Sequence, residues 1–171
     1  MNGNISLVFR GLDPCQIHQY QTIDTVRKIR ITAKIHEYKL QAIQLHGAES
    51  VDLCLALMKE KVEVIKAFGI DDSFDFSMLE PYLDVVDYFL FDTKAADHGG
   101  IGKVFDWKIL KKYLYDKPYF LSGGLSLENL IEVKRTKDER LFAIDLNSRF
   151  EIRLGVKNFK SIAEAIKMLG A

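Results

Sequence analysis

The chain has 171 residues, 48% of them hydrophobic, which suffices for one domain with a buried core, so we expect a single domain over residues 1–171. The 24 basic and 24 acidic residues balance, which argues against the large basic surface that nucleic acid requires. Two cysteines are too few for a disulfide framework, and neither a signal peptide nor a run of 18 apolar residues occurs, so a cytoplasmic protein without a membrane partner is expected.

The first forty residues predict one short strand and one long helix. The segment "LVFRGLDPCQI" (7–17) begins as a strand that Pro14 cannot continue. The segment "IDTVRKIRITAKIHEYK" (23–39) is typical of a helix, although "RKIRITA" (27–33) within it could instead be the remnant of a strand.

From residue 40 onward, short apolar runs alternate with longer amphipathic segments. Strands are predicted at 41–47, 62–69, 85–94, 118–124 and 141–151. Helices are predicted at 50–60, 73–84 (short, and broken near Pro81), 106–116, 126–136 and 158–169. Continuous apolar runs that are each followed by a helix indicate parallel strands covered on both faces, so the fold class is α/β, either a barrel or an open parallel sheet.

Polar and glycine residues stand where these strands end, and in barrels the chemistry sits at the carboxyl ends of the strands. In chain order the strand ends carry an imidazole, a lone acid, a glycine pair and a polar loop: His46, Asp92, Gly123 with Gly124, and 145–148. Backbone amides at the glycine pair, followed by a helix, can hold a phosphate group. The residues alone therefore predict a small phosphorylated substrate, with Asp92 as an acid or base.

Each of these features also has a plainer interpretation. The glycine pair could be an ordinary turn, Asp92 a helix cap or an ion-pair partner, and His46 a hydrogen-bonded residue of the sheet. The glycines of "HGGIGK", Gly99, Gly100 and Gly102, lack the context of a dinucleotide fingerprint and are more typical of a mobile active-site loop. Histidines and cysteines are scattered without metal-ligand spacing, so no metal is expected.

Several longer segments, taken together, resemble a known family. They are "QLHG", "VIKAFG", "FLFDTK" with "HGGIGKVFDW", "FLSGGLSLENL", and "AIDLNSRFE" with "GVKNFKSIAEAI", in this order. Over roughly residues 36–169 the sequence resembles phosphoribosylanthranilate isomerase of tryptophan biosynthesis.

The resemblance implies a (β/α) TIM-barrel fold and a cytoplasmic isomerase without cofactor or metal. The implied reaction is the rearrangement of N-(5'-phosphoribosyl)anthranilate to 1-(2-carboxyphenylamino)-1-deoxyribulose 5-phosphate. It also implies a role for each strand end: Asp92 protonates the ring oxygen, Gly123 and Gly124 hold the phosphate together with Asn147 and Ser148, Asp145 lies near the sugar, His46 lines the pocket floor, and the loop of Gly99, Gly100 and Gly102 covers the anthranilate.

The N-terminal part departs from the family. Phe9 aligns with the family's general-base cysteine, and Cys15 lies six residues later and is not assigned that role. The second strand, the catalytic arginine loop and the third strand of the family are not found, so about six strands are countable and the barrel is expected to be incomplete. Such a chain must close as a smaller barrel, cover the gap with residues 22–38, or pair with a second copy as a homodimer.

The sequence leaves three functions open. The first is the isomerase itself. The second is a truncated, non-catalytic relative that keeps only the phosphate-binding site. The third is another enzyme on a phosphate-binding barrel, similar to indole-glycerol-phosphate synthase or to an epimerase, which does not explain the "DTK" motif followed by the aromatic glycine loop.

Overall fold

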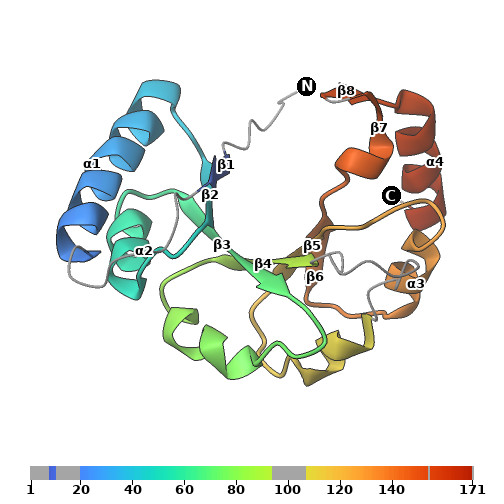
Figure 1. Ribbon diagram of the computed structural model, residues 1–171, viewed down its shortest axis with the longest axis horizontal. Helices are drawn as coiled ribbons and strands as arrows, with labels where there is room; N and C mark the ends of the chain where they lie inside the picture. The colour runs from blue at the N-terminus through green and yellow to red at the C-terminus, as the bar shows by residue number, and fades with distance from the viewer. Residues whose placement is uncertain (1–7, 11–19, 94–106, 154, 171) are drawn as a thin grey trace. The chain divides into compact units, whose positions relative to one another are not determined.

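The computed structural model describes residues 8–10, 20–93, 107–153 and 155–170 (Figure 1). Six strands form one sheet in chain order: β1 (Val8–Arg10), β2 (Ala42–His46), β3 (Glu63–Ile70), β4 (Tyr88–Thr93), β5 (Tyr119–Ser122) and β6 (Leu141–Ile144). The pairings of β1 with β2, β2 with β3 and β5 with β6 are parallel. The α/β expectation with about six strands is therefore confirmed.

Helices and one hairpin complete the described structure (Figure 1). The α-helices are α1 (Tyr20–Tyr38), α2 (Val51–Met58), α3 (Leu130–Arg135) and α4 (Phe159–Leu169). Three shorter segments are 3₁₀-helices: η1 (Phe76–Tyr82), η2 (Trp107–Lys112) and η3 (Ser148–Phe150). Strands β7 (Glu151–Arg153) and β8 (Val156–Lys157) form a separate antiparallel hairpin.

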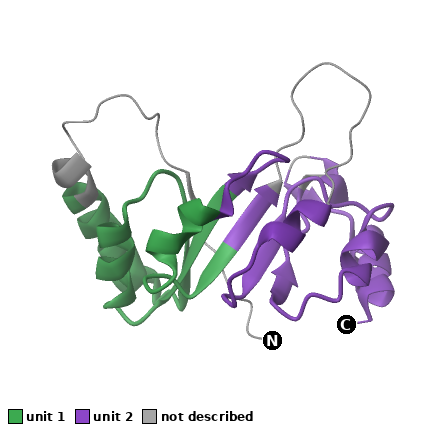
Figure 2. Cartoon of the chain, turned by 90° about the horizontal axis from the view of Figure 1, so that it is seen from below, with its two compact units in different colours: residues 1–68, 77–89 green, residues 69–76, 90–171 purple. Residues whose placement is uncertain are grey.

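The chain consists of two compact units, which Figure 2 shows in different colours. Unit 1 comprises residues 1–68 and 77–89, and unit 2 comprises residues 69–76 and 90–171. The helices α1 and α2 belong to unit 1, whereas α3, α4 and the hairpin belong to unit 2.

In unit 1, helices α1 and α2 pack against each other because each presents an apolar face. Ile31 and Ile35, one helical turn apart on α1, are both buried. Their spacing explains why the alternative of a strand remnant at 27–33 is wrong: these residues lie in the middle of α1. Ser50 caps α2, its hydroxyl accepting a hydrogen bond from the amide of Leu53 at 3.1 Å.

In unit 2, four aromatic rings form the centre of the core. Phe76, Phe91, Tyr113 and Tyr119 contact one another at centroid distances of 5.1–5.8 Å, mostly edge to face. Helix α3 packs against α4, which also contacts η3. Strands β4 and β5 therefore contribute to the core of this unit through Phe91 and Tyr119.

Three predicted boundaries are wrong, and at the first of them a contact with a distant residue lies where the element ends. The helix predicted at 106–116 is the 3₁₀-helix η2, which stops at Lys112 because the carbonyls of Tyr113 and Tyr115 accept hydrogen bonds from Arg140 instead of continuing a helix. The helix predicted at 126–136 begins only at Leu130. The strand predicted at 141–151 ends at Ile144 and is followed by η3.

The short helix predicted at 73–84 is also narrower than expected. It is the 3₁₀-helix η1, which begins at Phe76 and contains Pro81 rather than breaking at it. Proline lacks an amide hydrogen but is compatible with helical φ values, so a short 3₁₀-helix tolerates it near its end.

Candidate functional site

Three neighbouring strands of unit 2 end in the polar residues that the sequence singles out. Asp92 is the penultimate residue of β4 and is half-buried. Gly123 and Gly124 directly follow β5, and Asp145 directly follows β6. Because β5 and β6 are parallel and β4 is the neighbour of β5, this unit collects the acid, the glycine pair and the polar loop on successive strands.

The loop after β5 has a defined shape that needs its two glycines. Gly123 has φ = 82° and Gly124 has φ = 60°, a left-handed conformation that residues with a Cβ atom adopt at a cost. The side chain of Asn129 holds this loop by two hydrogen bonds. Its side-chain nitrogen donates to the carbonyl of Gly124 at 2.9 Å, and its side-chain oxygen accepts from the backbone amide of Ser126 at 2.8 Å.

This geometry corrects one part of the phosphate-binding hypothesis. Helix α3 begins at Leu130, six residues after Gly124, so the glycine pair does not open a helix and the helix dipole cannot be its source of positive potential. The Asn129 turn takes the place of the first helical turn. Asparagine side chains commonly hydrogen-bond nearby backbone groups in turns of this kind.

The loop after β6 is tied to the end of β5. The amide of Asp145 donates to the carbonyl of Leu121 at 2.8 Å, and the hydroxyl of Ser122 donates to the Asp145 carboxylate at 3.4 Å. Asp145 and Asn147 are both exposed, and Ser148 begins η3. The structure thus brings the residues after β5 and those after β6 into hydrogen-bonding contact.

Lys157 is a cation at this loop that sequence reasoning missed. Its ammonium donates to the side-chain carbonyl of Asn147 at 2.8 Å and pairs with the Glu151 carboxylate at 3.1 Å. The hydrogen bond from Lys157 holds the pKa of Glu151 below its ordinary value. No sequence signal identifies this lysine, because only the β7–β8 hairpin returns it to Asn147, ten residues earlier.

In unit 1, His46 ends β2 and is half-buried, with its Nδ1 atom 3.3 Å from the side-chain amide nitrogen of Gln44. The turn that follows it is held by a buried ion pair between Lys66 and Glu49, whose side chains are only 2% and 5% exposed and 3.1 Å apart. Lys66 also donates to the carbonyl of Gly47 at 2.6 Å, and Glu49 accepts from the amide of Gly47 at 2.9 Å.

Sequence reasoning did not single out this ion pair either, although a signal existed. Lys66 interrupts the apolar run "VEVIKAFG", and lysine is rarely buried in a strand unless a partner neutralises it. The partner, Glu49, lies on the preceding loop and could not have been assigned from spacing.

Several predicted positions cannot be described. Gly99, Gly100 and Gly102, the expected mobile loop, and Cys15 lie outside the described residues. Phe9 lies in β1, where its backbone is in register with Leu45 of β2. Among the described residues, no group of three or more histidines, cysteines and acids gathers as metal ligands would, and no helix combines the length and apolar character needed to cross a bilayer.

The arrangement of strands and loops indicates the structural class of the protein. An α/β sheet whose strand ends carry an acid, a glycine turn and a polar loop is typical of (β/α) TIM-barrel-type proteins. Solved structures agree: the phosphoribosylanthranilate isomerase of Thermotoga maritima superposes with a TM-score of 0.69 at 34% identity, over 84% of this chain and 68% of that chain. A structure of monomers generated from the dimeric Thermotoga maritima enzyme gives a TM-score of 0.66 at 28% identity, over 84% and 67% of the two chains.

Sequence comparison then gives the family. The model of the N-(5'phosphoribosyl)anthranilate (PRA) isomerase family matches residues 19–168. The N-(5'-phosphoribosyl)anthranilate isomerase of Parabacteroides distasonis is 43% identical over 136 residues, which are 80% of this chain. The chain therefore belongs to the phosphoribosylanthranilate isomerase family. It spans 62% of the length of the Parabacteroides relative.

Proposed function

We propose that the chain is a cytoplasmic isomerase that converts N-(5'-phosphoribosyl)anthranilate to 1-(2-carboxyphenylamino)-1-deoxyribulose 5-phosphate in tryptophan biosynthesis. The observation that carries the proposal is the set of strand ends in unit 2. Asp92 lies at the end of β4, and the Gly123–Gly124 turn and the Asp145–Ser148 loop follow β5 and β6. Membership of the family supports the same conclusion.

In this proposal Asp92 starts the reaction. Its carboxyl group donates a proton to the ring oxygen of the ribose, the bond between that oxygen and C1 breaks, and the anilinic nitrogen shares the resulting positive charge as an iminium. A base then removes the proton from C2, and tautomerisation of the enol gives the ketone. Phe9 stands at the position of the family's cysteine base, so this second proton transfer has no residue assigned to it.

The phosphate of the substrate binds at the loops after β5 and β6. Backbone amides of the Gly123–Gly124 turn donate to phosphate oxygens, and because glycine has no side chain the anion can approach these amides closely. Asn147 and Ser148 contribute from the second loop. Lys157 donates to the side chain of Asn147 and so holds it in place in this loop.

The remaining parts of the site have supporting roles. His46 lines the floor of the pocket, Asp145 lies near the sugar, and the loop of Gly99, Gly100 and Gly102 closes over the anthranilate and excludes water. No cofactor or metal takes part. A second copy of the chain covers open strand edges in a homodimer, a proposal that the dimeric state of the Thermotoga maritima relative supports.

The test follows the fluorescence of freshly prepared N-(5'-phosphoribosyl)anthranilate, which is lost on conversion. The wild-type chain is expected to turn the substrate over, and Asp92→Asn should lower kcat about 10²–10⁴-fold through loss of the proton donor. Asp116→Asn, which changes an exposed acid of the same unit, is the matched control and should keep the wild-type rate.

A second measurement separates the isomerase from a non-catalytic relative. A reduced analogue of the product is titrated into wild type and Gly123→Val by calorimetry. Equal rates in wild type and Asp92→Asn, together with analogue binding that Gly123→Val abolishes, would overturn turnover and leave phosphate binding alone. Failure of both turnover and analogue binding would remove the whole proposal.

A further inference from the structure

Unit 2 contains a cavity that the proposed reaction does not use. Its volume is about 530 Å³, within the range of roughly 300–1,000 Å³ that small-molecule sites occupy. The lining residues come from η2, the start of β5, α3 and the turn before β6: Lys108, Leu110, Lys111, Tyr119, Glu132, Arg135, Thr136, Asp138 and Arg140.

This cavity lies at the other ends of the strands from the candidate site. Tyr119 is the first residue of β5, and Arg140 immediately precedes β6. The proposed substrate site, in contrast, follows the last residues of the same two strands. A ligand in the cavity would therefore occupy a different place from the substrate phosphate.

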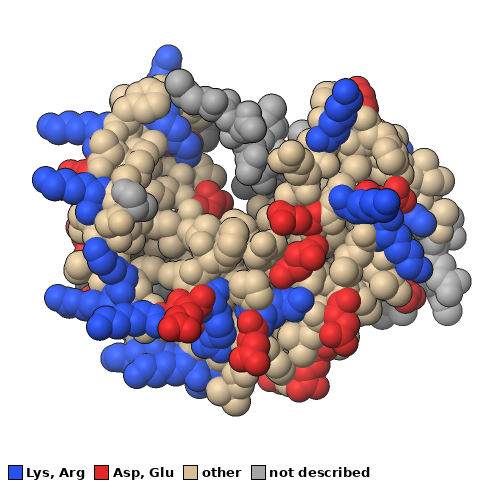
Figure 3. Space-filling model, turned by 180° about the vertical axis from the view of Figure 1, so that it is seen from behind, with Lys and Arg blue, Asp and Glu red and all other residues tan. Residues whose placement is uncertain are grey.

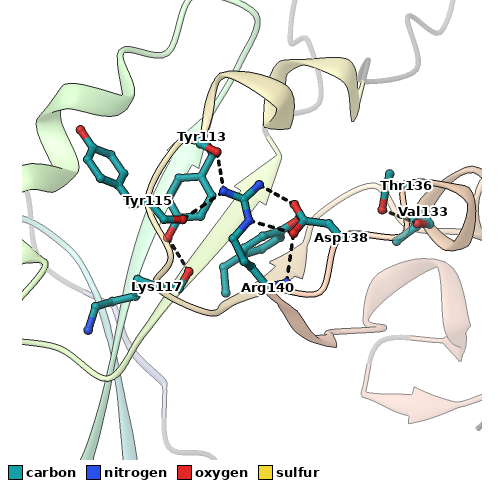
Figure 4. Close-up of polar contacts among 8 residues, drawn as sticks. Tyr113, Tyr115, Lys117, Val133, Thr136, Asp138 and Arg140 are labelled. Atoms are coloured by element: carbon teal, nitrogen blue, oxygen red, sulfur yellow. Dashed lines mark hydrogen bonds and ion pairs between the residues drawn. The ribbon is translucent and has the colours of Figure 1, made fainter.

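Arg140 lines the cavity, and several polar contacts hold its guanidinium group in place (Figure 4). Its Nε and Nη2 atoms each donate to the Asp138 carboxylate at 2.8 Å, and its Nη1 donates to the carbonyls of Tyr113 and Tyr115. The guanidinium also stacks over the Tyr113 ring, 4.8 Å from its centroid. Four hydrogen bonds leave one of its five N–H groups, on Nη2, without an acceptor among the described residues.

Asp138 is held as firmly as its partner. It accepts from Arg140 and also from the hydroxyl of Tyr119 at 3.0 Å. The hydrogen bonds from Arg140 keep the pKa of Asp138 below its ordinary value, so this acid stays charged and offsets Arg140. The Asp138–Arg140 pair is thus fixed before any ligand arrives, which lowers the entropy cost of binding.

The charge of the lining favours a dianion. Four basic side chains and two acidic ones line the cavity, which leaves two positive charges in excess. Lys111 and Arg135 reach the cavity from two different elements, η2 and α3, and both are exposed. Figure 3 shows Lys and Arg side chains gathered along the side of unit 2 that α3 and α4 form, which would attract an anion from solution.

We propose that this cavity binds a small organic phosphate, a phosphate dianion carried on an apolar body. Lys111, Arg135 and the remaining N–H group of Arg140 bind the phosphate oxygens, since guanidinium and ammonium donors match phosphate geometry and charge. The apolar body rests against the aliphatic stems of Lys108 and Lys111, which line the cavity and are exposed. The two surplus positive charges match the charge that a phosphate monoester carries at neutral pH.

Phenyl phosphate is the probe, and the readout is a titration followed by ¹H–¹⁵N nuclear magnetic resonance on the whole chain. Amide signals of Lys111, Arg135 and Arg140 should shift and saturate with phenyl phosphate. Inorganic phosphate should give weaker shifts at the same signals because it lacks the apolar body. Benzoate, a monoanion of similar shape, should bind more weakly than phenyl phosphate.

Charge reversal distinguishes this cavity from the substrate site. The double variant Lys111→Glu/Arg135→Glu should weaken phenyl phosphate binding at these signals by at least about tenfold, through lost pairing and added repulsion. It should leave any shifts of Gly123 and Gly124 unchanged. The matched control is Lys112→Glu/Lys160→Glu, which changes the net charge equally at exposed positions outside the lining and should keep wild-type affinity.

Three results would overturn the proposal. The first is a wild-type titration in which the signals of Lys111, Arg135 and Arg140 do not move. The second is a set of shifts confined to Gly123, Gly124 and Asn147. The third is an equal loss of affinity in the control and the lining variants, which would reduce the effect to net charge. The wild-type titration decides the first two even if a variant fails to fold.

Discussion

Replacing the buried Lys66 by methionine should destabilise the chain more than the same replacement of any exposed lysine. The Lys66 ammonium pairs with Glu49 at 3.1 Å and donates to the carbonyls of Gly47 and Ala67, with both charged side chains at most 5% exposed. Methionine retains most of the aliphatic stem but leaves the Glu49 carboxylate buried, with the amide of Gly47 as its remaining described donor. Breaking a buried ion pair in this way costs about 3–5 kcal/mol.

Urea unfolding followed by far-ultraviolet circular dichroism measures this loss. With a slope of about 2 kcal/mol per molar urea, the midpoint should fall by about 2 M. Lys59→Met, an exposed position at the end of α2, is the control and should change stability by less than about 0.5 kcal/mol.

The second variant separates the charge from the packing. Lys66→Met/Glu49→Gln removes both charges and keeps an acceptor for Gly47, so at least half of the lost stability should return. If Lys66→Met unfolds at the same urea concentration as Lys59→Met, or if the double variant is no more stable than the single one, the reasoning about the buried pair is wrong.

Three further predictions concern caps, charges and backbone. Ser50→Ala removes the cap of α2 and should cost about 0.5–2 kcal/mol, measured by the same urea unfolding. Asp138→Asn should cost about 1–2 kcal/mol at pH 7, because the pair with Arg140 is only partly shielded from solvent. The pKa of Asp138 is lowered in the folded chain. The difference in unfolding free energy between wild type and Asp138→Asn should therefore be largest above the ordinary aspartate value of 3.8 and should shrink as the pH falls below it. A difference that stays constant down to pH 2 would contradict the assignment. Gly124→Ala and Gly155→Ala should each lower the free energy of unfolding by about 1–2 kcal/mol, because both glycines have a positive φ and Gly155 has open space around it. Only Gly124→Ala should weaken binding of the product analogue. Equal affinities of the two variants would show that the Gly123–Gly124 turn does not bind the phosphate.

Much of the fold follows from local pattern. The apolar runs that predict strands at 41–47 and 62–69 correspond to β2 and β3 within one or two residues, because a buried strand needs a continuous apolar segment and little else. The ends of helices and strands that depend on contacts with distant residues could not be predicted from local pattern. η2 ends where Arg140, 28 positions after Lys112, takes the carbonyls of Tyr113 and Tyr115, and no local signal reports such a contact.

The residues of the candidate site likewise fall into those that local pattern could place and those that depend on distant contacts. Asp92, Gly123 and Asp145 could be placed on neighbouring strand ends from chain order alone, because parallel strands that succeed one another usually lie side by side. Lys157 and the Lys66–Glu49 pair could not, because their partners lie across a hairpin or on another loop. The roles assigned to Asp92, His46 and the loop of Gly99, Gly100 and Gly102 stay predictions.

The central claim is that the carboxyl group of Asp92 and the Gly123–Gly124 turn serve one bound molecule. The most direct measurement titrates the reduced product analogue into the chain labelled with ¹³C at aspartate carboxyl groups and with ¹⁵N at glycine amides. We expect the signals of Asp92, Gly123 and Gly124 to move together with one dissociation constant. Movement of the glycine amides with an unchanged Asp92 signal, or with a different dissociation constant, would contradict the account.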